Sequence, residues 1–183
     1  AVVPPPVHPG AFDPSFQASI YSEWDAIFTM VKQADGKIIV GGSFDGMNGV
    51  PRLGLARLNV DGSLDAAFDA GLNGGVEAVA LQADGKVVVG GSFSLAGAVP
   101  RHGLARLHTN GTLDVSFAPS LPVYARVTAL AVQPDGKVLA AVEGMTQDHS
   151  LTHLLRFLPD GALDVGFPLP VSDATDASVR DIV

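Results

Sequence analysis

The fold is decided by a stretch that occurs three times: IFTMVKQADGKIIVGGSF at 27–44, VEAVALQADGKVVVGGSF at 76–93 and VTALAVQPDGKVLAAVEG at 127–144. A second shared stretch follows each copy: RLGLARLNVDGSLDAAF at 52–68, RHGLARLHTNGTLDVSF at 101–117 and THLLRFLPDGALDVGF at 152–167. The matching aspartates Asp35, Asp84 and Asp135 are 49 and then 51 positions apart. A repeat of this period is typical of propellers and solenoids.

The alignment divides the whole chain. Its complete repeats are 27–68, 76–117 and 127–167. Residues 10–16 (GAFDPSF) match the end of a repeat, and 179–183 (VRDIV) match the start of one. Residues 1–9 are interpreted as a linker or a processed N-terminus. We therefore expect three full repeats with partial blades at both ends.

Each repeat is predicted to form four short strands. The opening segment, as in VTALAVQ, has apolar residues on both faces, which is typical of a strand buried on two sides. An Asp-Gly pair then predicts a tight hairpin turn into a second, β-rich strand that ends in two glycines in the first two repeats. LARL supplies a third strand, a second turn follows, and LDxxF is expected to return as a fourth strand.

These features predict an all-β chain, a β-propeller-like array of four-stranded antiparallel blades. The alternatives are a β-sandwich, which rarely repeats so closely in sequence, and a β-solenoid, whose coils are usually shorter. Three complete repeats are fewer than the four to eight blades that normally close a ring. Either the chain is a piece of a larger propeller, or other copies supply the remaining blades.

Composition excludes several classes of function. The net charge of −8 argues against nucleic-acid binding, which needs clustered Lys and Arg. No cysteine is present, so neither disulfides nor a thiolate metal site can form. No run of about eighteen apolar residues occurs, and no membrane insertion is expected. HExxH, GxSxG and GxGxxG are all absent, so we expect no catalytic residues, no metal and no cofactor.

The consensus AVQPDGKVLVGGSF followed by GLARLNxDGSLDxxF resembles the bacterial delta-sixty repeat, a β-propeller repeat of large secreted and surface proteins. The resemblance runs from Phe12 to Val183, and the third repeat departs from it with 141–144 (AVEG) in place of GGSF. It implies a propeller fold and a secreted or cell-surface location. It implies no catalytic activity.

Residues that recur in every repeat are predicted to be scaffold, because an asymmetric site is needed only once. One such set is the aspartate of LDxxF (Asp65, Asp114 and Asp164). The other is the arginine of the third strand (Arg57, Arg106 and Arg156). We expect the carboxylate to cap a turn and to pair with the arginine.

Residues specific to one or two repeats are better candidates for binding, and they fall in the variable loops. In propellers, the loops that join second to third strands and one blade to the next cluster on one face. The candidates there are Tyr21, Trp24, Asp45, Asn48, Arg52, Arg101, His102, Tyr124, Arg126, Asp148 and His149. Arg52 and Arg101 occupy matching positions.

We therefore expect a non-catalytic repeat module of a bacterial secreted or cell-surface protein, presenting loops for protein or glycan binding. The alternative is a self-assembling repeat protein of an extracellular fibre or sheath. A propeller-based hydrolase or lyase ranks last. The expected partners are a protein or glycan ligand, or further copies or repeats of the same protein.

Overall fold

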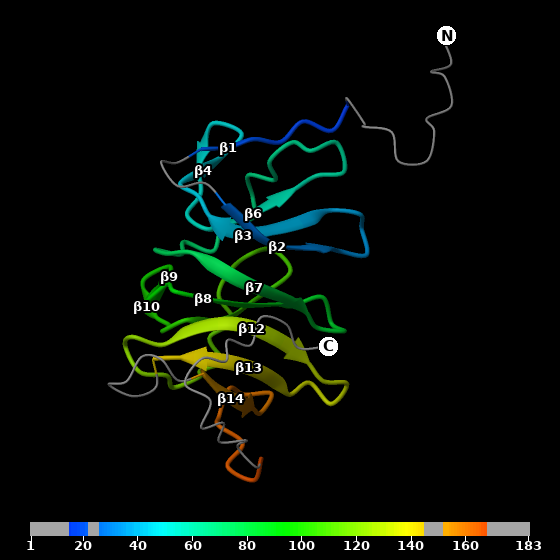
Figure 1. Ribbon diagram of the computed structural model, residues 1–183. Helices are drawn as coiled ribbons and strands as arrows, with labels where there is room; N and C mark the ends of the chain where they lie inside the picture. Colours follow the sequence, from blue (N-terminus) through cyan, green and yellow to red (C-terminus); the bar gives the residue numbers. More distant parts are fainter. Residues whose placement is uncertain (1–14, 22–25, 145–151, 168–183) are drawn as a thin grey trace.

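The computed structural model describes residues 15–21, 26–144 and 152–167, and its described part is built from strands and turns without helices (Figure 1). Each repeat forms one three-stranded antiparallel sheet. The first sheet has β2 (Ala26–Lys32), β3 (Ile38–Ser43) and β6 (Leu55–Leu58). The second has β7 (Val76–Leu81), β8 (Val87–Gly91) and β11 (Leu104–Leu107). The third has β12 (Arg126–Val132), β13 (Val138–Glu143) and β14 (Thr152–Phe157).

The Asp-Gly pairs make the predicted hairpin turns. In the first turn, Gly36 has φ +86°, a backbone conformation that favours glycine. The Asp35 carboxylate accepts a hydrogen bond from the Lys37 N–H at 3.1 Å, which fixes the turn from within. The same bond recurs in the other two repeats, so local sequence sets the register of all three hairpins.

The prediction of a fourth strand is wrong in its extent, because LDxxF forms far less β-structure than expected. LDxxF is joined to the third strand by one isolated bridge in each repeat: Leu58 with Leu64, Leu107 with Leu113, and Phe157 with Leu163. In the first repeat, Asp65 ends the pairing because its carboxylate accepts from the Ala67 N–H at 3.3 Å, while the Phe68 N–H bonds the Asp65 carbonyl at 3.1 Å. These bonds turn the chain away before a strand can continue.

Short hairpins that the sequence did not predict fill the loops between second and third strands. In the first repeat, β4 (Gly46–Met47) pairs with β5 (Val50–Pro51), and β1 (Ile20–Tyr21) pairs with β4. In the second repeat, β9 (Leu95–Ala96) pairs with β10 (Val99–Pro100). The loops between second and third strands in these two repeats therefore have regular β-structure of their own.

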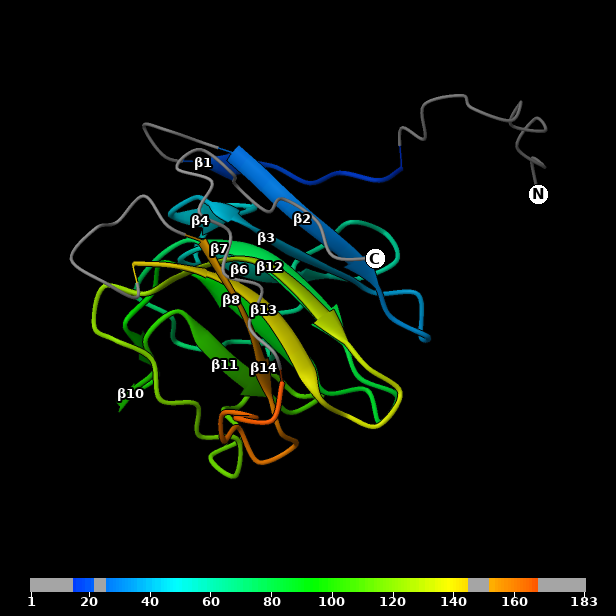
Figure 2. The same ribbon diagram turned by 60° about the horizontal axis from the view of Figure 1, so that its bottom comes forward.

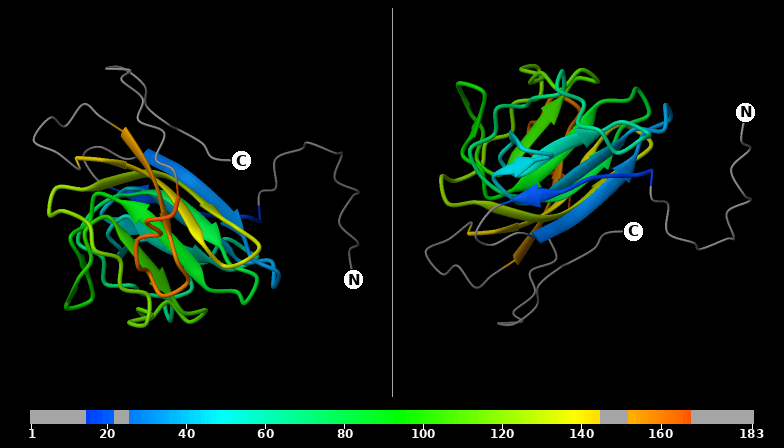
Figure 3. Two further views of the ribbon diagram at one scale, coloured as in Figure 1. Left: turned by 90° about the horizontal axis from the view of Figure 1, so that it is seen from below. Right: turned by 90° about the horizontal axis from the view of Figure 1, so that it is seen from above.

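The three sheets stack face to face, and the core lies between them (Figures 1 and 3). Between repeats 1 and 2, Ile39 and Leu55 of the first sheet pack with buried valines of the second. Between repeats 2 and 3, the matching residues Val88 and Leu104 pack with buried residues of the third sheet. The same interface is thus built twice from equivalent positions.

Glycines at the end of the second strand let the sheets approach closely. A side chain at Gly41 would lie 2.8 Å from the Val76 side chain, and one at Gly90 would lie 2.6 Å from Val127. The first strands β2, β7 and β12 consequently lie side by side and form one edge of the stack (Figure 2). In each of them, a register shift lies between the first and third residues of the repeat.

Candidate functional site

The strand directions give the molecule two different ends. The recurrent Asp-Gly hairpin turns at 33–37, 82–86 and 133–137 lie at one end, here named the turn end (Figure 1). The segments that join second to third strands, 44–54 and 93–103, lie at the other end, together with the linkers 69–75 and 118–125. This is the loop end. The topology therefore places the recurrent turns at one end of the molecule and the variable loops at the other.

A recurrent ionic cluster lies toward the turn end. In the first repeat, Arg57 Nε donates to Asp65 Oδ2 at 2.9 Å, and Lys37 Nζ donates to the same oxygen at 2.6 Å. The Arg57 guanidinium also lies 4.4 Å from the centre of the Phe68 ring, a cation–π contact. Equivalent residues repeat this arrangement in the second and third repeats. The scaffold role predicted for these residues is confirmed.

In the second repeat, this cluster is almost fully buried: Arg106 is 6% exposed and Asp114 is 3% exposed. Burial acts to raise the pKa of Asp114, but hydrogen bonds from Ser116 and Lys86 and the charge of Arg106 outweigh it. The pKa of Asp114 therefore lies well below its usual range. The pKa of Asp65 is also lowered, first by the Lys37 hydrogen bond and then by Arg57.

The buried arginines also join consecutive repeats. Arg57 Nη1 donates to the main-chain carbonyl of Thr109 in the second turn of the next repeat. Arg106 Nη1 donates to the carbonyl of Pro159 at 2.8 Å, which is the equivalent contact one repeat further on. Arg57 and Arg106 thus each join the packing of two consecutive blades.

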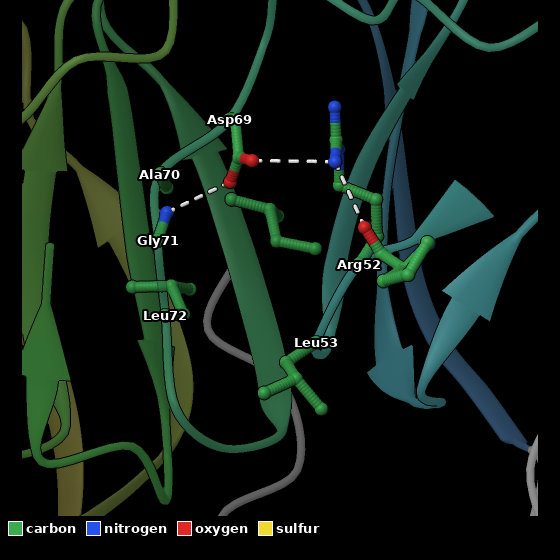
Figure 4. Close-up of a pocket in the computed structure, with 8 residues that line it drawn as sticks. Arg52, Leu53, Asp69, Ala70, Gly71 and Leu72 are labelled. Carbon is green, nitrogen blue, oxygen red and sulfur yellow. Dashed lines mark hydrogen bonds and ion pairs between the residues drawn. The ribbon is translucent and has the colours of Figure 1, made fainter.

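At the loop end, a recess of about 210 Å³ lies between repeats 1 and 2 (Figure 4). Arg52 Nη1 lies 3.2 Å from Asp69 Oδ2, and the Gly71 N–H donates to Asp69 Oδ1 at 2.9 Å. Main-chain carbonyls of Pro51 and Ala66 accept from the same guanidinium at 2.8 and 3.0 Å. The recess therefore holds a carboxylate between a fixed arginine and a main-chain N–H.

The matching position in repeat 2 carries Arg101 followed by His102. Arg101 Nη1 donates to the Pro100 carbonyl at 2.9 Å, as Arg52 does to Pro51. Ala118 stands at the position of Asp69. Arg101 Nε and His102 Nδ1 are buried and have no hydrogen-bond partner in the part of the chain that the structure describes, and the same holds for Arg52 Nε. The sequence prediction for these two residues stays open to a ligand.

A second charged group lies where the first strands begin. Arg126 Nε donates to Glu77 Oε1 at 2.7 Å, and Arg126 Nη1 lies 3.3 Å from Glu143 Oε2. These contacts raise the pKa of Arg126, with the Glu77 hydrogen bond as the largest cause. Glu77 also lines a hollow of about 390 Å³ along the edges of β2, β7 and β12. The predicted candidate Arg126 is thus held by two carboxylates from different repeats.

The other predicted candidates differ in exposure and in hydrogen bonding. Tyr124 is 77% exposed, and Asp45 is also exposed. Tyr21 is 42% exposed, and its ring lies against Gly46. Asn48, at φ +50° in the β4–β5 turn, accepts from the Ser19 N–H and donates to the Gly62 carbonyl. Both of its polar groups are used within the scaffold, so we assign it a structural role.

Three predicted candidates, Trp24, Asp148 and His149, lie outside the described residues. Three charged residues of the loop end were not predicted: Asp69, Glu77 and Glu143. A signal for them exists, because an alignment of the repeats places Ala118 opposite Asp69, Phe28 and Thr128 opposite Glu77, and serines opposite Glu143. A charge that appears in one repeat only marks a position outside the common scaffold.

Two further properties concern the described residues alone. Among residues 15–21, 26–144 and 152–167, no group of three or more His, Cys, Asp or Glu side chains could hold a metal ion. In the same residues, there is no helix of the length and apolarity needed to cross a membrane.

The stacked antiparallel sheets and their repeated junctions define the chain as an all-β protein of the β-propeller class. A family model described as "Domain of unknown function (DUF5122) beta-propeller" matches residues 33–68, 82–117 and 133–167. The chain belongs to this family.

No curated protein matches the chain. Among solved structures, it is similar to the extracellular domain of BT4673 from B. thetaiotaomicron, a protein described as a one component system, with 15% identity and a TM-score of 0.47. The match covers 86% of this chain and 18% of that one, so the chain spans less than a fifth of that protein's length.

Proposed function

We propose that the protein is a non-catalytic β-propeller repeat module that binds a protein or glycan ligand through its loop end. The observation that carries this proposal is the separation of residues between the two ends. Near the turn end, the recurrent charged residues form ion pairs with one another and pack within the scaffold. Arg101, Tyr124 and Arg126, by contrast, are specific to one or two repeats and lie at the loop end. Exposed aromatic and arginine side chains are the types that dominate binding energies.

A bacterial secreted or cell-surface setting is part of the same proposal. The consensus resembles the delta-sixty repeat, which occurs in large secreted and surface proteins. Fractionation of the native host, with detection by an antibody, tests this setting.

Binding through the loop end is tested with arrays of glycans and of purified surface proteins. Tyr124→Ala and Arg126→Ala should weaken binding of any array ligand while leaving the melting temperature nearly unchanged. Lys32→Ala, which removes an exposed charge near the turn end, is the matched control. The proposal fails if no ligand binds, or if Lys32→Ala weakens binding as much as the loop-end variants do.

A propeller-based hydrolase or lyase remains the last alternative. It would need polar side chains converging on the hollow along β2, β7 and β12. The carboxylate there, Glu77, is paired with Arg126, and Glu143 is paired with the same guanidinium. Both carboxylates are ion-paired, which argues against a role as general acid or base.

Self-assembly is a second candidate function, favoured by the outer face of repeat 1. This face has a recess of about 310 Å³ lined by apolar side chains that include Met30 and Leu58. Ile27 is 46% and Met30 is 64% exposed, whereas the equivalent Val76 and Val79 of repeat 2 are 0% and 8% exposed. At the internal junctions, Ile39 with Leu55 and Val88 with Leu104 cover this surface.

The residues that would fill that recess have equivalents on the outer face of repeat 3, the half-buried Leu139 and Leu154. We propose that repeat 3 of one copy packs on repeat 1 of another. Met30→Lys and Leu139→Lys should each abolish association in analytical ultracentrifugation. An equimolar mixture should restore a dimer, because each variant keeps one intact face. A monomer at all concentrations of the unchanged chain contradicts this second candidate.

A further inference from the structure

Arg52 and Arg101 hold the same position in consecutive repeats, but only Arg52 has a carboxylate partner among the described residues. The repeat 1 recess shows how this position holds a carboxylate. One oxygen of Asp69 faces the guanidinium at 3.2 Å, and the other accepts from the Gly71 N–H at 2.9 Å (Figure 4). Main-chain carbonyls fix the guanidinium in place.

Repeat 2 keeps the arginine and replaces the acid. The Arg101 guanidinium donates to the Pro100 carbonyl at 2.9 Å, and this is its one side-chain hydrogen bond within the described residues. A guanidinium carries five N–H donors, and a carboxylate is the partner that matches its planar fork. The Nε atoms of Arg52 and Arg101 are both buried and unpartnered among the described residues, so the two arginines differ in the carboxylate partner and not in this atom. His102 Nδ1, next to Arg101, is also buried and unpartnered there. A half-buried arginine without a counter-charge is unfavourable, so the carboxylate of a ligand would interact favourably with Arg101.

An exposed aromatic residue belongs to the linker that contacts the segment after this arginine. A side chain at Gly103 would lie 2.8 Å from the Ala125 carbonyl oxygen, so the segment that follows Arg101 and His102 contacts the linker that contains Tyr124. Tyr124, at the edge of that contact, is 77% exposed. A tyrosine ring offers an apolar face with a polar tip, against which the C–H face of a pyranose ring can lie. Arg101, His102 and Tyr124 therefore belong to two loop-end segments that meet at Gly103 and Ala125.

The charge of the protein limits the ligand. A net charge of −8 repels molecules with many negative charges, including strongly acidic peptides and polyanions. A ligand with one carboxylate in an otherwise neutral frame meets Arg101 without this penalty. Such a frame with a stacking face is typical of a glycan that contains an occasional uronic acid.

We propose that Arg101, His102 and Tyr124 form a binding site for the carboxylate of a uronic acid residue in a mostly neutral glycan. This inference rests on the proposed loop-end binding function and names its ligand. The carboxylate takes the place that Asp69 occupies in repeat 1, with the tyrosine ring against the sugar.

Titration calorimetry with a trisaccharide that carries one central glucuronate tests the site. Arg101→Gln and Ala118→Asp should each weaken binding by about tenfold or more, the first by removing the cation and the second by supplying an internal carboxylate. Arg52→Gln is the matched control, and it should leave the affinity unchanged. The methyl ester of the same trisaccharide should bind about tenfold more weakly than the acid.

Several results would overturn the inference. These are no binding of the trisaccharide, equal binding of its methyl ester, or an affinity that Ala118→Asp leaves unchanged. If a hexapeptide whose only charged side chain is one aspartate binds more tightly than the trisaccharide, the site is a peptide site instead. If array ligands bind through Tyr124 and Arg126 while the trisaccharide does not, this inference falls and the proposed loop-end function stands.

Discussion

Asp114 is the most constrained of the three recurrent aspartates. It is 3% exposed and is paired with Arg106, Lys86 and Ser116, so its removal leaves a buried guanidinium without a counter-charge. We expect Asp114→Ala to lower the free energy of unfolding by about 3 kcal/mol, the scale of a broken buried ion pair. Urea unfolding measures this loss. Asp84→Ala, which removes an exposed aspartate in a hairpin turn, is the control, and equal losses would contradict the scaffold role.

The same residue should make stability depend on acid. The folded-state pKa of Asp114 is lowered, so its contribution is complete above the unfolded pKa of about 4 and is lost as the pH falls toward the folded pKa. The difference in unfolding free energy between the unchanged protein and Asp114→Asn should therefore shrink as the pH falls from 5 toward 2.5. Chemical unfolding at several pH values measures it. A difference that stays constant over this window would show that the carboxylate charge contributes nothing.

At the scale of elements, the glycines of the second strand decide how closely two blades pack. A Cβ at Gly90 would lie 2.6 Å from the Val127 side chain, so Gly90→Ala must push repeats 2 and 3 apart. We expect a loss of about 1–3 kcal/mol, the usual cost of overpacking. Gly166→Ala is the control, because its Cβ would meet its nearest neighbour at an ordinary 3.5 Å. Thermal melts compare the two, and a silent Gly90→Ala would show that the junction can relax.

Sequence reasoning succeeded where structure is set locally and failed where it is set by neighbours. The three hairpins follow from the Asp-Gly pairs, whose glycines adopt positive φ. The predicted fourth strand is a single bridge in the first repeat, because the Asp65 carboxylate accepts a hydrogen bond from the Ala67 N–H. The β4–β5 hairpin was missed because its strands have two residues each, too few to show a period.

The candidate site was predicted in part for a similar reason. Arg52 and Arg101 were recognised because they lie in the variable loops between second and third strands, and Tyr124 because it is aromatic in a variable linker. Asp69 was not recognised, since its pairing with Arg52 depends on how a linker folds back over the preceding loop. Contacts of this kind are visible only when blades are placed side by side.

At the scale of the whole molecule, repeat 2 should be the most stable part. It is covered on both faces by neighbouring sheets, and all five residues of β8 are buried. Amide hydrogen exchange should therefore be slowest in β8, and β2, whose outer face is largely exposed, should exchange faster. Exchange monitored by mass spectrometry measures this order. Equal protection of β2 and β8 would mean that the outer face of repeat 1 is covered in solution.

The contact from each buried arginine to the next repeat bears on how such a chain can lengthen in evolution. Arg57 and Arg106 reach main-chain carbonyls, at Thr109 and Pro159, and every residue type supplies a carbonyl. A duplicated gene segment can therefore be inserted between two units without a compensating change at the receiving side. Selection is then free to alter loops in one copy while the other keeps its original form, which is how Asp69 and Ala118 can differ over an otherwise common frame.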